Sequence, residues 1–396
     1  EKLQKRLDKL NRISRENLTG IRVIRAFGNE KYEEKRFDET NESYAEVAKK
    51  LNKLMAISQP LFFFLLNIAI IVIFWISSKM INVGTLQVGQ LVAFIEYLFH
   101  AMFSIMLFSM VFVMYPKAQV SANRIMEVLN TEPIIKSPKN GIKDTENKGT
   151  IEFENVSFTY PNGEEPVIKD VSFSGKKGEV IAFIGSTGSG KSTLINLIPR
   201  FYDVTKGSIK IDGVDVRDYD LKYLRKKIGF IPQKTLLFTG SIANNIKFGK
   251  KDAEYKEVED SAKIAQAYEF ISNKPNKFDE IITEGGSNVS GGQKQRLSIA
   301  RAIVRKPDIY IFDDSFSALD FKTDAILRKE LRSETKDAIV LIVAQRIGSI
   351  MDADKIIVLN EGEVVGIGTH KELIKTCPIY HEIATSQLTE EELANE

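Results

Sequence analysis

Residues 179–198 join a buried-strand pattern to a glycine-rich loop of the kind that holds phosphate. The apolar run EVIAFI leads into GSTGSGKST, and the helical run TLINLI follows. Glycines let backbone N–H groups close around a phosphate, and the N-terminus of the following helix adds positive potential. In this pattern the lysine reaches the terminal phosphates and the next serine ligates Mg²⁺. The loop predicts nucleotide binding by Gly185, Ser186, Thr187, Gly188, Ser189, Gly190, Lys191, Ser192 and Thr193.

Two downstream segments could complete such a site. Residues 309–313 form an apolar strand pattern that ends in Asp313, an acid placed to hold Mg²⁺ through water. A strand that ends in aspartate is weak evidence by itself, and it gains its meaning from VSGGQKQRLSIARA at residues 289–302. With this serine-glycine-glycine signature opening a helix, the chain resembles one half of an ATP-binding cassette (ABC) exporter, from its first helix to its last strand.

The resemblance implies roles for further residues, with ATP and Mg²⁺ as cofactors. Tyr160 matches the aromatic residue that stacks on adenine, and Gln233 matches the glutamine that senses Mg²⁺ and contacts the membrane helices. Residues 317–320 match a loop that crosses the dimer interface, and residues 15–30 match a coupling helix that docks on the partner's ATP-binding domain. The signature grips the γ-phosphate held by the opposite subunit, through Ser290, Gly291, Gly292 and Gln293.

Two positions depart from the pattern of family members that hydrolyse ATP well. Those members carry Glu after the strand-ending aspartate and His in the switch loop, where this chain has Asp314 and Gln345. The aspartate is one methylene shorter and falls about an ångström short of the attacking water, an error that can cost ~10²-fold in rate. A neutral glutamine donates a hydrogen bond but cannot become a cation. We expect slow catalysis by Asp314, Gln345 and Gln233, with Mg²⁺ held by Ser192, Gln233 and Asp313.

These departures favour a heterodimer in which this chain's own ATP site is slow and its signature completes the fast site of the partner. The partner is then a second, different half-transporter that carries the Glu and the His. We interpret the chain as a subunit of a multidrug-type exporter that moves hydrophobic or amphipathic compounds across the cell membrane. A homodimer that exports a lipid or a peptide is the alternative within the family, and a regulatory module that binds ATP and only clamps its partner is a rival outside it.

Two apolar stretches predict membrane-spanning helices. Residues 56–76 carry no charge, and residues 91–115 form a second span after a short polar turn. About 20 apolar residues of helix cross a bilayer. Basic residues flank the pair on the side of both soluble segments, which the positive-inside tendency places in the cytoplasm. The spans make membrane lipid a partner and oppose a soluble DNA-repair ATPase.

The second span carries polar residues on one helix face. Glu96, His100 and Ser104 recur at four-residue spacing, which places them one above another. An ionisable residue within a span usually faces the bundle interior or a water-filled cavity. We therefore favour a substrate pathway along this face, and a polar contact between helices is the alternative.

The chain divides by composition into four parts. Residues 1–130 are interpreted as the C-terminal part of a helical transmembrane domain. An apolar patch around Gly20 lies there between two charged helices, as a contact element, and an ordinary amphipathic helical hairpin is the alternative interpretation. Residues 131–150 form a Pro- and Gly-containing linker. Residues 151–386 alternate strand and helix patterns as in an α/β P-loop ATP-binding domain, and residues 387–396 form an acidic tail. Because the chain begins inside a polar helical pattern without Met, we expect it to be a C-terminal fragment of a longer protein.

Charge and cysteine content exclude several classes of function. The 55 basic and 53 acidic side chains leave a net charge of +2, so no overall field favours nucleic acid as a partner. Cys377 is the only cysteine, which excludes an internal disulfide and fits a reducing compartment.

Overall fold

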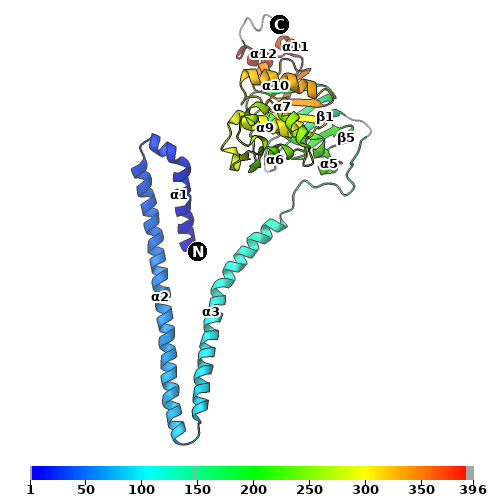
Figure 1. Cartoon of the computed structure of the whole chain (residues 1–396). Coiled ribbons are helices and arrows are strands. Elements are labelled where there is room, and N and C mark those ends of the chain that lie inside the picture. Colours follow the sequence, from blue (N-terminus) through cyan, green and yellow to red (C-terminus); the bar gives the residue numbers. More distant parts are fainter. Residues whose placement is uncertain (1, 146–148, 162, 389–396) are drawn as a thin grey trace. The chain divides into compact units, whose positions relative to one another are not determined.

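The computed structural model describes residues 2–145, 149–161 and 163–388, and it comprises two compact units, residues 1–132 and 133–396 (Figure 1). The described part of the first unit consists of the helices α1 (Lys2–Ala26), α2 (Glu30–Asn82) and α3 (Val88–Asn130). All the strands of the described residues lie in the second unit, where two larger sheets pack with helices around them.

Helices α1 and α2 lie side by side and run in opposite directions (Figure 1). An ion pair of 2.7 Å between Glu16 and Arg36 links them, and Ile13 is buried between them. The predicted coupling segment, residues 15–30, covers the end of α1, a turn and the first residue of α2. Its apolar side chains are exposed in this unit, with 79% of Leu18 and 76% of Phe27 accessible. These exposed apolar side chains form a surface that another protein surface could contact.

Helices α2 and α3 are each long and apolar enough to cross a membrane. The predicted spans, residues 56–76 and 91–115, lie inside them, and the polar remainder of each helix extends beyond the span. Most apolar side chains of the spans are exposed, which suits helices whose surroundings are lipid or other helices. Lys79 lies 4.4 Å from the ring centroid of Trp75 at the end of the first span, a pairing suited to the membrane interface.

The central sheet of the second unit has six strands in the order β12-β11-β3-β10-β9-β6. Their bounds are β12 Glu363–Gly368, β11 Lys355–Asn360, β3 Val180–Gly185, β10 Ile339–Val343, β9 Ile309–Asp313 and β6 Ile228–Ile231. All neighbours are parallel except β11 and β12. The carboxyl ends of β3, β10, β9 and β6 therefore meet at one edge, which is where parallel sheets place their ligands.

A second, antiparallel sheet has the order β2-β1-β4-β5, with bounds Ile168–Lys176, Thr150–Phe158, Lys206–Ile211 and Val214–Asp215. A small pair joins β7 (Gly240–Ser241) to β8 (Ile281–Ile282). The helices are α4 (Lys191–Leu197), α5 (Leu221–Lys226), α6 (Ile242–Lys247), α7 (Tyr255–Ile264), α8 (Tyr268–Ser272), α9 (Gly291–Ile303), α10 (Phe321–Glu334), α11 (His370–Thr376) and α12 (Pro378–Thr385). Single 3₁₀ turns occur at Lys277–Asp279, Glu284–Gly286 and Ile347–Ser349.

The central sheet is buried on both faces, which explains why its strands are continuously apolar. Successive side chains of a strand point to opposite faces. Ile181 and Phe183 of β3 join the core shared with the antiparallel sheet and α4, whereas Ala182 and Ile184 join the core beneath the other helices. The predicted combination of a helical transmembrane part and a largely parallel α/β domain is therefore what the chain adopts.

A buried ion pair ties the two sheets together. The Lys227 Nζ atom lies 2.8 Å from Asp212 and 3.0 Å from Asp308, and Asp212 also accepts hydrogen bonds from the backbone N–H groups of Gly149 and Thr150. Burial by itself would lower the pKa of Lys227, but its hydrogen bonds to the two carboxylates outweigh burial and raise that pKa. Lys227 therefore stays charged, and the pair depends on Asp212, whose side chain is 1% exposed.

Asp212→Ala should lower the free energy of unfolding by about 3–5 kcal/mol, because it leaves Lys227 buried with half of its partners. Asp308→Ala is the matched control, since that carboxylate is 41% exposed and its loss should cost less than about 1 kcal/mol. Urea unfolding of the detergent-solubilised chain, followed by circular dichroism, measures both. Equal losses for the two variants would contradict the dependence on Asp212.

Candidate nucleotide-binding site

The glycine-rich loop connects the end of β3 to the start of α4, as the sequence predicts. Two of its glycines are required by the backbone. A Cβ atom at Gly185 would collide with the carbonyl oxygen of Leu359, and Gly190 has φ of +97° in the left-handed region, where a Cβ would press on Ile168. The loop therefore owes its shape to close backbone approach, and a glycine-rich loop of this kind can turn backbone N–H groups toward a phosphate.

Lys191 lies across the loop. Its ammonium group donates to the carbonyl oxygens of Gly185 and Ser186 at 2.8 and 2.7 Å and to the Ser189 hydroxyl at 3.2 Å. Burial lowers the pKa of Lys191, although the nearby carboxylates of Asp313 and Asp314 act in the opposite direction. A buried cation held only by neutral oxygens gains strongly from an anion, so this arrangement suits a terminal phosphate.

Ser192 and Asp313 meet beside the loop, although they are far apart in the sequence. The Ser192 hydroxyl donates to the Asp313 carboxylate at 2.9 Å. Burial raises the pKa of Asp313, the Ser192 hydrogen bond lowers it, the neighbouring Asp314 raises it and Lys191 lowers it. Because the pKa is raised on balance, a further positive charge beside this carboxylate would be favourable, as a magnesium ligand requires.

Asp314 lies at the centre of the remaining predicted residues. Its Oδ2 atom accepts hydrogen bonds from Gln345 Nε2 at 2.8 Å and from Gln233 Nε2 at 3.2 Å. The three residues follow β9, β10 and β6, whose carboxyl ends are adjacent in the sheet. Burial raises the pKa of Asp314, and the hydrogen bond from Gln233 offsets that effect only in part. The two glutamines thus hold this carboxylate by neutral amide groups.

Tyr160 reaches the site from the loop after β1. Its hydroxyl lies 3.0 Å from the Thr193 hydroxyl, within hydrogen-bonding distance. Its ring meets those of Phe158 and Tyr202 edge to face, with centroids 4.8 and 5.2 Å away. The aromatic side chain is therefore positioned next to the phosphate loop by packing and by one polar contact, where a base could stack.

The signature residues open helix α9. The Ser290 hydroxyl accepts a hydrogen bond from Gln293 N, and the Gln293 side chain accepts one from Ser290 N, so the two residues form a capping box. A Cβ at Gly291 would meet nothing within 4 Å, which leaves open space for an approaching group, and one at Gly292 would lie 3.3 Å from a backbone oxygen. The signature does not line the cavity at this chain's own phosphate loop.

That cavity has a volume of about 220 Å³. The residues around it are Val167, Thr187, Gly188, Gly190, Lys191, Ser192, Thr193, Gln233, Asp313, Asp314, Val343 and Gln345. Val167 and Val343 are the two that the sequence did not single out. Val343 ends strand β10 and Val167 precedes β2, and neither side chain carries a polar group, so no chemical signal marked them.

Comparison with known families fits this geometry. The model of the family described as ABC transporter matches residues 168–317, and the model described as ABC transporter transmembrane region matches residues 1–115. A Mycobacterium tuberculosis protein named as an uncharacterised ABC transporter ATP-binding protein is 38% identical over 390 residues, which cover 98% of this chain and 67% of that protein. The chain belongs to the ABC transporter family.

Other relatives bear on the type of ABC transporter. The uncharacterised ABC transporter ATP-binding protein YfiB of Bacillus subtilis is 41% identical over 98% of this chain and 67% of its own length. YgaD of the same organism, a putative multidrug export ATP-binding/permease protein, is 35% identical over 94% of the chain and 64% of its own length. A solved structure of a bacterial Atm1-family ABC exporter with ATP bound aligns with a TM-score of 0.86 at 29% identity, covering 98% of this chain and 69% of that one.

The expectations on fold, enzyme class and location are therefore confirmed. The ABC transporter chain is a membrane protein that joins an exporter transmembrane region to a cytoplasmic ATP-binding domain, and its activity is ATP hydrolysis coupled to transport.

Lys191→Ala should weaken ATP binding at this chain's loop by at least about 30-fold, because loss of a charge partner at a buried site costs about 2 kcal/mol or more. Calorimetric titration of the solubilised chain with ATP measures the change. Lys177→Ala is the control, since Lys177 pairs with Asp337 away from the cavity. Unchanged affinity in Lys191→Ala would remove the loop from the ATP site.

Proposed function

We propose that this chain is one half of a heterodimeric multidrug-type exporter, and that its own ATP site is slow. The observation that carries the proposal is the arrangement around Asp314, which stands where efficient members of the family have Glu. Both hydrogen bonds that its Oδ2 atom accepts come from neutral glutamine amides, at 2.8 and 3.2 Å. A general base must reach its water to within hydrogen-bonding distance, and a short carboxylate drawn toward Gln345 and Gln233 is poorly placed for that.

The switch position adds a second handicap. Gln345 is occupied with Asp314, and a glutamine supplies no positive charge to the γ-phosphate. Transition-state charge on the phosphoryl group is stabilised mainly by preorganised donors and cations. With the phosphate loop intact, the site is then suited to hold ATP and poorly suited to hydrolyse it.

Mg²⁺ fits the residues beside the loop. Ser192 and Asp313 present a hydroxyl and a carboxylate oxygen 2.9 Å apart, and oxygen is the ligand atom that Mg²⁺ prefers. We infer that Ser192 would hold the ion directly, Asp313 through water and Gln233 by its side-chain oxygen. Bound Mg²⁺ would neutralise charge on the phosphates and would add a second positive neighbour to Asp313, beside Lys191.

The partner is a second half-transporter with Glu and His at the equivalent positions. The Gly291 end of α9 is open, and the signature lies outside this chain's own cavity, so its phosphate-binding N–H groups are available to another subunit. This chain would then complete the fast site of the partner. The exposed apolar residues of the segment 15–30 supply a docking surface for the partner's ATP-binding domain.

The transported compounds are hydrophobic or amphipathic, and membrane lipid surrounds the spans. On α3 the Glu96 carboxylate lies 3.7 Å from the His100 imidazole, within a span that is mostly apolar. The Ser104 hydroxyl donates to the His100 carbonyl oxygen, so this serine is satisfied within its own helix. The ionisable pair is the feature that would meet a polar group of the compound, and the multidrug name of the relative YgaD agrees with this type of cargo.

Variants of the two halves of the site separate a heterodimer from a homodimer. Gly291→Asp should lower steady-state ATPase activity of the assembled transporter by about 10²–10³-fold, because it places a negative charge on a phosphate-binding helix terminus of the fast site. Asp314→Ala should change the rate only several-fold, since it removes a carboxylate that is already too short.

Both ATPase rates are normalised to bound ATP. The double variant Asp314→Glu with Gln345→His tests the opposite direction, and it should raise the rate of hydrolysis at this chain's site. Should Asp314→Ala silence the transporter as fully as Gly291→Asp, the two sites are equivalent and the homodimeric lipid or peptide exporter replaces the proposal.

Replacement of both Glu96 and His100 by Leu should change drug-stimulated ATPase activity and transport while ATP binding stays intact, because the pair is far in the chain from the phosphate loop. Uptake of fluorescent amphipathic compounds into inverted vesicles measures transport. Tyr97→Leu, at a position between the two on α3, is the control for loss of a polar side chain. If transport of every tested compound is unchanged, the pair contributes only to helix packing.

A further inference from the structure

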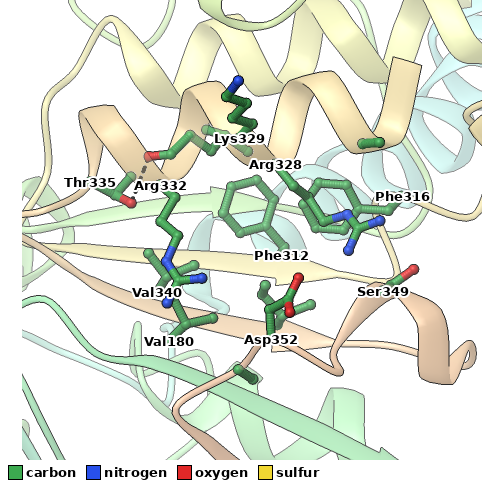
Figure 2. A pocket seen from close by; sticks show the side chains of 14 residues that line it. Val180, Phe312, Phe316, Arg328, Lys329, Arg332, Thr335, Val340, Ser349 and Asp352 are labelled. Carbon is green, nitrogen blue, oxygen red and sulfur yellow. Dashed lines mark hydrogen bonds between the residues drawn. The ribbon is translucent and has the colours of Figure 1, made fainter. Parts of the chain in front are cut away.

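A second cavity lies on the side of the central sheet away from the nucleotide. Its volume is about 330 Å³, within the range of small-molecule sites, and α10 forms one wall while β3, β9 and β10 form the floor (Figure 2). Strand β9 alternates its side chains, so Phe312 faces this cavity while the neighbouring Asp313 faces the nucleotide site. The two sites therefore share one strand.

The floor is apolar and partly aromatic. Phe312 and Phe316 stack with ring centroids 5.1 Å apart and an interplanar angle of 27°. Phe316, Val340 and Ile342 keep 5%, 6% and 6% of their surface exposed, whereas Phe312 behind them is fully buried. When a flat apolar group covers such exposed apolar surface, water leaves the surface, and this burial is favourable. An aromatic ring suits this floor, because offset stacking on Phe316 continues the existing stack.

Three cationic side chains of α10 line the cavity, and in Figure 2 those of Arg328 and Arg332 extend toward the sheet while that of Lys329 extends away from it. Arg328 is already neutralised by two hydrogen bonds to Asp324, each 3.1 Å, and it also donates to the Gly348 carbonyl oxygen. Lys329 makes no ion pair within the described residues, and the guanidinium of Arg332 lies 3.9 Å from Asp354, too far for a hydrogen bond. These two side chains are three residues apart on the helix and can reach one ligand together.

One carboxylate, that of Asp352, also lines the cavity. Lys329 has no ion pair within the described residues, and Arg332 has only the pair of 3.9 Å with Asp354, so both side chains keep hydrogen-bond donors for a bound anion. Arginine binds a carboxylate through two parallel hydrogen bonds, and lysine adds a point charge beside it. An anion at the mouth with an apolar body below is the ligand chemistry that meets both parts of the cavity.

We propose that this cavity binds a small aromatic carboxylate, with its ring on Phe316 and its carboxylate on Lys329 and Arg332. A cavity of about 330 Å³ lies at the lower end of the range of small-molecule sites, roughly 300–1,000 Å³. An arylalkanoate of the size of 4-phenylbutanoate fits this volume. The occupant would touch α10, which begins directly after residues 317–320, and the segment that follows Gln345. It is thus a site for regulation from the cytoplasm, separate from the transported cargo.

The experiment measures binding of 4-(4-fluorophenyl)butanoate by fluorine NMR to the full chain in phosphatidylcholine nanodiscs, with empty nanodiscs subtracted. The neutral amide of the same compound should bind at least about tenfold more weakly, because it forms no charge-assisted hydrogen bonds. The double variant Lys329→Gln with Arg332→Gln should weaken the carboxylate by a similar factor. Lys336→Gln is the matched control, since Lys336 is an exposed lysine just after the same helix and does not line the cavity.

Ala325→Phe tests the location of the ligand. Ala325 is exposed on α10 at the mouth of the cavity, so a phenyl group there should block entry without disturbing the core. Retained binding of an ATP analogue confirms that each variant is folded. Equal binding of carboxylate and amide, or full binding to Ala325→Phe, would place the compound in lipid or in the transmembrane part and overturn the proposal. Neither result bears on the speed of the ATP site.

Discussion

The hydrogen bond between Ser192 and Asp313 joins the two halves of the nucleotide site across 121 residues of chain. It forms because β3 and β9 both flank β10, and parallel strands bring their carboxyl ends to one edge of the sheet. Every other contact of the site depends on this alignment of the parallel strands. The phosphate loop follows β3, Gln233 follows β6, Asp314 follows β9 and Gln345 follows β10. A sheet that is buried on both faces holds these ends in place, since none of its strands can slip without exposing apolar side chains.

The electrostatics of the site divide into a part suited to binding and a part poorly suited to hydrolysis. Lys191 is buried and donates hydrogen bonds to neutral oxygens, and burial raises the pKa of Asp313, so ATP with Mg²⁺ would add favourable charge contacts for both. Asp314 accepts hydrogen bonds from Gln233 and Gln345. Nucleotide binding would exchange the present hydrogen bonds of Lys191 and Ser192 for contacts with phosphate and Mg²⁺, whereas activation of water would require Asp314 to leave its amide donors. This difference supports the proposal that the site binds ATP and hydrolyses it slowly.

The same strand that presents Asp313 to the nucleotide presents Phe312 to the cavity under α10. A rigid sheet can therefore connect a soluble anion on one face with the catalytic residues on the other without any change of fold. Coupling of this kind requires that the ligand bind two states of the domain with different affinity. The hydrogen bond from Arg328 to the Gly348 carbonyl oxygen offers such a point, because it ties α10 to the segment that begins at Gln345.

Local patterns in the sequence determined the phosphate loop, the signature, the two spans and the alternation of strands and helices. Each depends on residues within a few positions of one another, and backbone geometry leaves little freedom for glycines before a helix or for 20 apolar residues in a row. The sequence also identified Asp314 and Gln345 as departures from the family pattern. It did not predict that Asp314 would accept hydrogen bonds from Gln345 and Gln233. That contact, the pairing of Tyr160 with Thr193, the places of Val167 and Val343, and the cavity beneath α10 were decided by tertiary structure. They depend on strand order and helix packing between distant segments, which no periodicity in a single sequence records.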